Sequence, residues 1–346
     1  MARRRYRGRR RGYYISPIVV LAGLAVIVLG VFLLVRALGG DDAEKETGGE
    51  NAAESAEGNA GTAQTDGDQT GVPEEDSELP EKFVSTVSGI DCVLTELEEE
   101  DIHTGGLILV NNWNFFHFPA EQELVSVYEE KSDGYYVRDL TVYLAPEAME
   151  AMDQMLMDFR SQGGSKSVNV VAGHRTEEYQ QGLFDRSAER NGLAHAEKYV
   201  AKPGGSEHHT GLAVDFSILR GDGSSADYDG SGEYAWINKN CHKYGFVVRY
   251  ETGKEELTGI WNEPWHFRYL GVPHASELVR KGMCMEEYMD YLKKFTFDGK
   301  HLFIDCVAGE YEVWYTEGTQ VYLPEGGEYE VSGNNTDGFI VTCKVA

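Results

Sequence analysis

The sequence has 346 residues and a formal net charge of −27, with 58 acidic side chains against 31 lysines and arginines. This length is enough for two ordinary domains. The composition argues against nucleic acid as a partner, because phosphate binding needs clustered lysine and arginine, and the large cluster of these residues is confined to the first residues of the chain.

The N-terminus has the pattern of a membrane anchor. Residues 1–14 form a basic tail, with seven arginines and no acid among the first eleven residues. Residues 15–36 follow, uncharged up to Val35, which is long enough for a helix to cross a bilayer core, since this needs about 20 residues. A cleaved signal peptide has an apolar region of only about 7–15 residues, so we favour an uncleaved anchor. The arginines then keep the N-terminus in the cytoplasm and the rest of the chain outside.

The next segment, residues 37–82, is predicted to be a disordered linker. Between Asp41 and Lys82 it has fourteen acidic residues, two lysines and almost no large apolar side chains. Such a segment cannot bury enough surface to offset the entropy lost on ordering. Repulsion between its charges should keep it extended, so that it holds the following domain away from the membrane.

Residues 83–295 are predicted to be an α+β domain. A helix is expected at 146–160, where Pro146 suits the first turn and apolar residues share one face. A second helix is expected at 177–191, because Thr176 can cap it and Gly192 can end it. Further elements are a helix at 234–244 and strands at 167–172, 212–218, 246–250 and 266–270. This alternation indicates a small antiparallel sheet with helices packed on it.

Residues 296–346 are predicted to be a small all-β module. Short alternating runs at 302–304, 311–315, 319–323 and 339–342 are separated by glycine, asparagine and proline turns. The sequence leaves the role of this module open.

The five cysteines have no Cys-x-x-Cys spacing, so they do not form a redox or metal motif. Disulfides are permitted outside the membrane. Cys306 and Cys343, which bracket most of the C-terminal module, are the pair we favour, although connectivity cannot be read from a sequence. Cys241 lies in a helical pattern and is expected to be a buried apolar residue.

Two short segments carry the pattern of a catalytic metal site. They are Ser206-Glu207-His208-His209-Thr210-Gly211-Leu212-Ala213-Val214-Asp215 and, about fifty residues later, Glu263-Pro264-Trp265-His266. His208, Asp215 and His266 can supply three ligands to Zn²⁺. Three protein ligands with an open fourth position are typical of catalytic zinc sites, whereas structural sites are closed by four. The sequence therefore predicts a metallohydrolase.

The spacing suggests how the ligands converge. Asp215 is expected on a strand and His208 on the loop leading into it, with Gly211 allowing the backbone to turn. His209 should then point away from the metal. Glu263 can take a proton from water that the metal activates. Pro264 makes a regular helix through this segment unfavourable, which distinguishes the pattern from helical His-Glu-x-x-His metalloproteases.

The combined pattern Ser-x-His-x-x-Gly-x-Ala-x-Asp and Glu-x-Trp-His resembles the VanY-type zinc D-Ala-D-Ala carboxypeptidases, a group with D,D- and L,D-carboxypeptidase members. The resemblance runs from about Leu107 to Val272. It includes three further blocks, at residues 107–111, 173–180 and 199–204.

The resemblance implies roles for four residues. Glu263 would be the general base, and Arg175 would polarise the scissile carbonyl and stabilise the oxyanion. Gln180 and Ser206 would hold the terminal carboxylate of the substrate. Taken alone, the neighbouring acids Glu177 and Glu178 would instead favour a surface ion pair for Arg175.

The activity implied is that of a membrane-anchored zinc D,D-carboxypeptidase, which removes the terminal D-alanine from peptidoglycan stem peptides in wall remodelling or glycopeptide resistance. An L,D-carboxypeptidase and an endopeptidase would share the same ligands and base, so both alternatives stay open. A non-catalytic wall-binding protein of the same fold is a further alternative, against which the intact ligand set and Glu263 argue.

Overall fold

The computed structural model describes residues 82–84 and 89–345, which belong to one compact unit, Glu75–Ala346. The predicted basic tail, membrane anchor and linker up to residue 81 lie outside the described residues. Within the described ranges, no helix combines the length and the apolar character that a membrane span requires.

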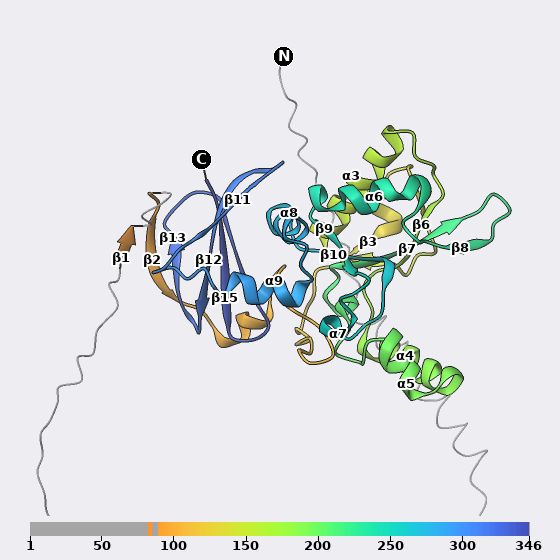
Figure 1. Ribbon diagram of the computed structural model, residues 1–346, viewed down its shortest axis with the longest axis horizontal. Coiled ribbons are helices and arrows are strands. Elements are labelled where there is room, and N and C mark those ends of the chain that lie inside the picture. Colours follow the sequence, from red (N-terminus) through yellow and green to blue (C-terminus); the bar gives the residue numbers. More distant parts are fainter. Residues whose placement is uncertain (1–81, 85–88, 346) are drawn as a thin grey trace, which may run out of the picture. The chain divides into compact units, whose positions relative to one another are not determined.

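A six-stranded sheet carries two of the three predicted metal ligands, Asp215 and His266 (Figure 1). Its strand order is β4 (Tyr136–Val137), β6 (Val168–Ala172), β7 (Ala213–Leu219), β10 (Glu263–Tyr269) and β9 (Phe246–Tyr250), with β8 (Ser225–Asp227) paired to β7. The predicted α+β class is confirmed. The expectation of a wholly antiparallel sheet is wrong for one pair, because β4 and β6 are parallel. The helix α3 (Pro146–Ser161) lies between them in sequence, and such a crossover permits parallel pairing.

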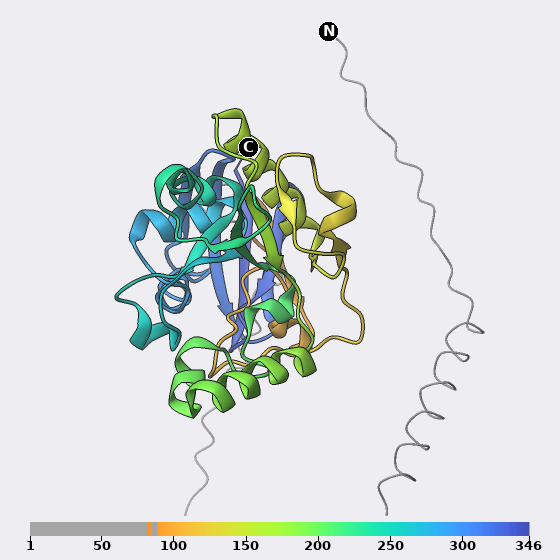
Figure 2. The same cartoon turned by 90° about the vertical axis from the view of Figure 1, so that its right-hand side faces the viewer.

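The predicted helices are confirmed with small shifts in their bounds. The first is α3, which begins at Pro146 and buries its apolar side chains. The second is α4 (Glu177–Asn191), where the Thr176 hydroxyl accepts a hydrogen bond from the backbone N–H of Tyr179. The third divides into α6 (Ala235–Asn240) and a 3₁₀ turn, Cys241–Tyr244. The helix α5 (Leu193–Tyr199) follows α4, and the two lie together below the six-stranded sheet in Figures 1 and 2.

The strand β10 begins three residues before the predicted start at residue 266. It contains Pro264, which cannot donate to a strand ladder. The pairing of β10 with β9 is irregular between Glu263 and Phe267. The proline is therefore tolerated at a position where the ladder is already interrupted.

The C-terminal module contains a four-stranded antiparallel sheet. Its order is β11 (Leu302–Cys306), β12 (Gly309–Glu317), β15 (Gly338–Lys344) and β14 (Tyr329–Gly333). The strand β14 was not expected from the sequence. The module also includes β13 (Gln320–Pro324), which pairs with β2 (Asp91–Glu96), and β2 pairs with β1 (Lys82–Val84). Residues 91–96, assigned from the sequence to the catalytic domain, thus pair with the C-terminal module.

Two helices that the sequence analysis did not assign connect these parts. They are α8 (Val272–Lys281) and α9 (Met285–Leu292), and Figure 1 shows them between the two groups of strands. Their apolar side chains share one buried cluster with residues of β9, β11, β12 and β15. The remaining short elements are α2 (Val127–Glu130), α7 (Glu255–Thr258), β3 (Val125–Ser126), β5 (Tyr143–Leu144) and 3₁₀ turns at Glu99–His103, Glu207–Thr210 and Gly232–Tyr234.

All five cysteines are free, so the predicted bond between Cys306 and Cys343 is wrong. These residues lie on β11 and β15, and β12 runs between the two strands. Neighbouring strands are about 4.8 Å apart, so two spacings exceed the Cα separation of about 7 Å that a disulfide can bridge. Cys241 is buried, as expected.

Candidate active site

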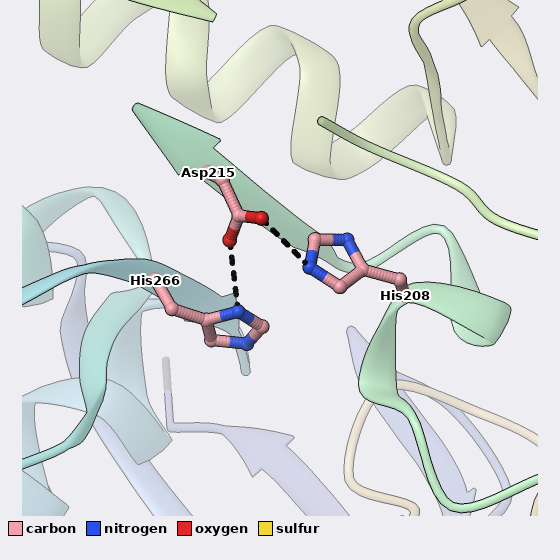
Figure 3. Close-up of side chains that lie close together, drawn as sticks. All are labelled: His208, Asp215 and His266. Atoms are coloured by element: carbon pink, nitrogen blue, oxygen red, sulfur yellow. Dashed lines mark hydrogen bonds and ion pairs between the residues drawn. The ribbon is translucent and has the colours of Figure 1, made fainter. Parts of the chain in front are cut away.

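Two paired strands and one turn bring the three predicted ligands together. Asp215 on β7 and His266 on β10 lie directly opposite each other in the antiparallel pairing. His208 lies in the 3₁₀ turn just before β7, and Gly211 ends that turn with φ of 74°. The ligand atoms of the three residues all lie within 4.8 Å of one another (Figure 3). The described residues contain no other group of three His, Cys, Asp or Glu side chains that converges in this way.

The hydrogen bonds of the two imidazoles decide which nitrogen faces the metal position. His208 donates from Nδ1 to the Gly173 carbonyl at 2.7 Å, and its Nε2 lies 3.2 Å from Asp215 Oδ2. His266 has the opposite orientation, with Nε2 3.3 Å from Glu207 Oε2 and Nδ1 2.9 Å from Asp215 Oδ1. Two imidazole nitrogens and one carboxylate oxygen thus converge at a buried point. This donor set fits zinc with an open coordination position.

The electrostatics of the three groups favour a cation. Although burial raises it, the pKa of Asp215 is held well below its usual range by His208, His266 and Arg175. Burial and the Arg175 charge lower the pKa of His208 to about 4, which leaves it neutral and able to bind a metal. Burial lowers the pKa of His266, but Asp215 and Glu207 outweigh it and raise the value to about 9. A metal must therefore displace a proton from His266, which couples metal binding to proton release.

Glu263 faces the same position from the start of β10. It lines a cavity of about 280 Å³ together with all three ligands, Arg175, Gln180 and Ser206. Its carboxylate oxygen Oε2 lies 4.0 Å from His266 Nδ1. Burial raises the pKa of Glu263 to about 7, with Asp215 adding to the effect and His266 and Arg175 opposing it. A carboxyl group with a pKa near the working pH can both accept and return a proton.

Arg175 lies in the segment between β6 and α4 and points into this cavity. Its Nη2 donates to Asp215 Oδ2 at 2.7 Å, and its Nη1 donates to Gln180 Oε1 at 3.4 Å. The alternative of a surface ion pair with Glu177 or Glu178 is therefore not what the structure shows. The Arg175 side chain is 19% exposed, so its charge acts in a partly desolvated cleft, where electrostatic stabilisation of an oxyanion is strong.

Gln180 and Ser206 both lie in the wall of the cavity and are buried. Gln180, on the first turns of α4, donates from Nε2 to the Ala201 carbonyl at 2.8 Å. Ser206 immediately precedes the turn that carries His208. Both residues thus line the same cavity as Arg175, and Gln180 also contacts Arg175 directly.

Two residues of the same motif have contacts that the sequence analysis missed. His209 lies outside the ligand group; its Nδ1 donates to the Arg175 carbonyl at 2.7 Å, and its Nε2 accepts from the Gly204 N–H at 3.1 Å. It thereby ties Arg175 to the loop before the motif. Glu207 contacts His266, as described above. A carboxylate beside a metal-binding histidine is a frequent arrangement, but the sequence alone did not show which histidine Glu207 would meet.

Comparisons with known proteins agree with this geometry. The model of the VanY family, D-alanyl-D-alanine carboxypeptidase, matches residues 141–272, which include every site residue named above. A D-alanyl-D-alanine carboxypeptidase of Enterococcus faecium is 34% identical over 256 residues, which are 71% of this chain and 77% of the relative. The bifunctional D-Ala-D-Ala dipeptidase and D-Ala-D-Ala carboxypeptidase VanXYC of Enterococcus gallinarum is 38% identical over 157 residues, 44% of this chain and 81% of that protein.

A solved structure extends the similarity to the fold. The vancomycin resistance D,D-dipeptidase VanXYg, in complex with a D-Ala-D-Ala phosphinate analogue, aligns with a TM-score of 0.65 and 32% sequence identity. The alignment covers 73% of this chain and 98% of VanXYg. On the evidence of the matched residues and of relatives covered over most of their length, this chain belongs to the VanY family of D-alanyl-D-alanine carboxypeptidases.

Proposed function

We propose that this protein is a zinc-dependent D,D-carboxypeptidase that removes the terminal D-alanine from peptidoglycan stem peptides. The observation that carries the proposal is the convergence of His208, Asp215 and His266 in one cavity with Glu263 and Arg175. Family membership supports the choice of a D-Ala-D-Ala bond as the target.

The metal would be held by His208 Nε2, Asp215 and His266 Nδ1. Zinc at this position supplies a Lewis acid that polarises a carbonyl and lowers the pKa of water. The remaining chemistry belongs to the side chains around it. Their arrangement suits hydrolysis of a peptide bond whose product carboxylate and amine are both formed inside the cavity.

Glu263 is the proton carrier of this mechanism. Its carboxylate takes a proton from the attacking water and passes it to the amine of the departing D-alanine, for which its raised pKa is suited. Arg175 stabilises the negative charge that develops on the scissile carbonyl oxygen. Arg175 also donates a hydrogen bond from Nη1 to Gln180. Its guanidinium group can therefore contact both the oxyanion and the terminal carboxylate of the substrate.

Gln180 and Ser206 are proposed to bind the free carboxylate of the terminal D-alanine. An anion taken out of water without hydrogen-bond partners is costly to bury. The need for these partners limits cleavage to the last residue of the peptide, which distinguishes a carboxypeptidase from an endopeptidase.

We also propose that the protein acts outside the cell, attached by a single membrane helix at residues 15–36. The support is the uncharged run preceded by the arginine-rich tail at 1–14. The residues from 37 up to the start of β1 would serve as the linker between this helix and the described unit. Removal of terminal D-alanine at that location is the chemistry expected of wall remodelling and glycopeptide resistance.

The test is a comparison of four peptides with the purified enzyme: a pentapeptide stem ending in D-Ala-D-Ala, its C-terminally amidated form, a tetrapeptide stem, and the dipeptide D-Ala-D-Ala. We expect cleavage of the pentapeptide and none of the amidated form. Equal rates on both would indicate an endopeptidase, and cleavage of the tetrapeptide alone would indicate an L,D-carboxypeptidase. Fast hydrolysis of the dipeptide would place the enzyme with its bifunctional relative from Enterococcus gallinarum.

A further inference from the structure

A buried network of charged side chains lies directly behind His266. Its centre is Glu207, whose side chain is fully enclosed. Glu207 Oε1 accepts a hydrogen bond from Arg249 Nε at 2.7 Å and lies 3.4 Å from Arg268 Nη1. The second carboxylate oxygen, Oε2, lies 3.3 Å from His266 Nε2. One carboxylate thus joins two arginines to a metal ligand.

Both arginines are themselves held in place. Arg249 on β9 donates two further hydrogen bonds to Glu286 on α9, at 2.7 and 3.0 Å. Arg268 on β10 donates from Nη2 to the carbonyls of Gly106 and Ile108, at 3.0 and 3.1 Å. Neither guanidinium group can turn away without breaking these contacts. The two arginines therefore fix the position of the Glu207 carboxylate through Oε1, the oxygen that does not face His266.

The charges within this network balance. Glu207 and Glu286 carry two negative charges, and Arg249 and Arg268 carry two positive charges. Because a buried carboxylate is tolerated only when it is paired and hydrogen-bonded, the two arginines keep Glu207 in its ionised form. An ionised carboxylate can only accept a hydrogen bond. The atom that faces it on His266 must therefore be a protonated nitrogen.

We propose that Glu207 is a positioning residue for the metal ligand His266. By accepting the Nε2 proton, Glu207 fixes the orientation of the imidazole and leaves Nδ1 facing Asp215 and His208. The assignment rests on the proposed metal-dependent function. It goes beyond that function by giving the buried acid of the motif a defined task, which is to set the affinity of the site for its metal.

The two histidine ligands differ in this respect. His208 is oriented by a neutral acceptor, the Gly173 carbonyl, whereas His266 is oriented by a charged one. A carboxylate behind a metal-binding imidazole raises its basicity as well as fixing its angle, and loss of such a partner typically weakens metal binding about 10–100-fold. The contribution of Glu207 should therefore be visible in metal affinity itself.

The same chain offers a matched control. Glu286 pairs with Arg249 from the other side and is also largely enclosed, with a side chain 14% exposed. It has no contact with His266. Glu286→Gln and Glu207→Gln each remove one negative charge from Arg249, so both should lower stability. Only Glu207→Gln also removes the carboxylate from His266.

The experiment measures zinc affinity of the full-length protein in detergent by competition with a chromophoric chelator, with melting temperature measured in parallel. We expect zinc binding about 10–100-fold weaker for Glu207→Gln and changed less than about twofold for Glu286→Gln. Equal zinc affinity in the two variants would overturn the proposal, because it would reduce Glu207 to a member of the ion-pair network.

A second variant keeps the test decisive if Glu207→Gln does not fold. Glu207→Asp retains the charge between the arginines but shortens the side chain, so that it no longer reaches His266 and the arginines equally well. It should fold and still bind zinc more weakly than the wild type; unchanged affinity would contradict the positioning role. If the wild type binds zinc tightly but cleaves no D-Ala-D-Ala peptide, the proposed function fails while the role of Glu207 stands.

Discussion

At the scale of single residues, the site depends on carboxyl groups that share one small cavity but have opposite properties. Asp215 is kept ionised by two histidines and Arg175, whereas burial raises the pKa of Glu263 to about 7. The first is suited to hold a cation and the second to exchange a proton. This division follows from their neighbours and not from their residue type.

Replacing Glu263 by glutamine should separate metal binding from catalysis. Glu263 belongs to the cavity but not to the ligand group, so Glu263→Gln should retain the metal. It cannot take up a proton, and turnover should fall by a factor of about 10²–10⁴. The measurements are zinc content and the rate of D-alanine release. A variant with nearly full activity would show that another group is the base.

Asp337, outside the active site, should make the stability of the fold depend on pH. Burial raises its pKa, but hydrogen bonds from Lys293, Asn334 and Tyr315 outweigh burial and lower the value to about 2, from 3.8. The folded-state pKa is thus depressed, so the contribution to stability is present above pH 4 and is lost as the pH falls toward 2.

Because Asp337 is 40% exposed, solvent screening limits this contribution to about 1 kcal/mol. Denaturant unfolding at several pH values should show that the wild type loses more stability than Asp337→Asn between pH 4 and pH 2. If the free energy of unfolding falls equally with pH in the two proteins, Asp337 does not make this contribution to stability.

At the scale of elements, the site is built where a 3₁₀ turn enters β7. Gly211 ends the turn with φ of 74°, and a Cβ atom at this position would lie 2.7 Å from Leu124 Cδ2 and 3.1 Å from the Ala145 nitrogen. Both the backbone conformation and the space exclude a side chain. The glycine therefore sets the path by which His208 reaches Asp215.

Gly211→Ala should consequently weaken both fold and metal site. The left-handed conformation costs an alanine about 1–2 kcal/mol, and the close contacts add to this. We expect a lower melting temperature together with weaker zinc binding. As a control, Gly223→Ala has a similar φ of 83° but no atoms near the added Cβ, and it lies in the loop between β7 and β8, which does not line the cavity. It should lower stability without changing zinc affinity; equal losses of zinc affinity would show that the effect is not local to the site.

Elements with strong local signals could be predicted from the sequence, and those fixed by distant contacts could not. Pro146, Thr176 and Gly192 mark helix ends by local chemistry, and the corresponding bounds agree closely. The pairing of β2 with β13 joins residues more than two hundred positions apart and leaves no local signal. The start of β10 was missed because Pro264 indicates a break, and only the irregular pairing with β9 shows why it is tolerated.

In the candidate site, too, the local arrangement could be predicted from the sequence and the distant contacts could not. The spacing of His208, Gly211 and Asp215 predicted a turn followed by a strand, and the structure has this arrangement. The direct pairing of Asp215 with His266 depends on sheet register, which one sequence does not specify. The contact of Glu207 with His266 depends in addition on Arg249 from β9 and Arg268 from β10.

At the scale of the described unit, the C-terminal module is joined by hydrogen bonds to residues 103–115, which precede the six-stranded sheet in the chain. Asn335, in the loop between β14 and β15, donates from Nδ2 to the carbonyls of Leu109 and Phe115 at 2.8 and 3.1 Å. Its Oδ1 lies 2.8 Å from His103 Nδ1. The carbonyls of Gly106 and Ile108, in the same segment, hold Arg268. The module thus supports the segment that anchors the network behind His266.

Asn335→Ala should therefore destabilise the protein by about 2–3 kcal/mol, because it removes two hydrogen bonds, one of them to the carbonyl of the buried Leu109. Thr336→Ala, at the exposed neighbouring position, is the control and should have a small effect. The measurement is denaturant unfolding of both variants. If the two lose the same stability, the contacts of Asn335 do not couple the module to the rest of the unit.

The most direct test of the central claim is a zinc titration of chelator-treated protein, followed by D-alanine release from a stem pentapeptide. The ligand set of His208, Asp215 and His266 predicts no activity without metal and full recovery at one equivalent of zinc per chain. Undiminished release of D-alanine by the metal-free protein would contradict the account.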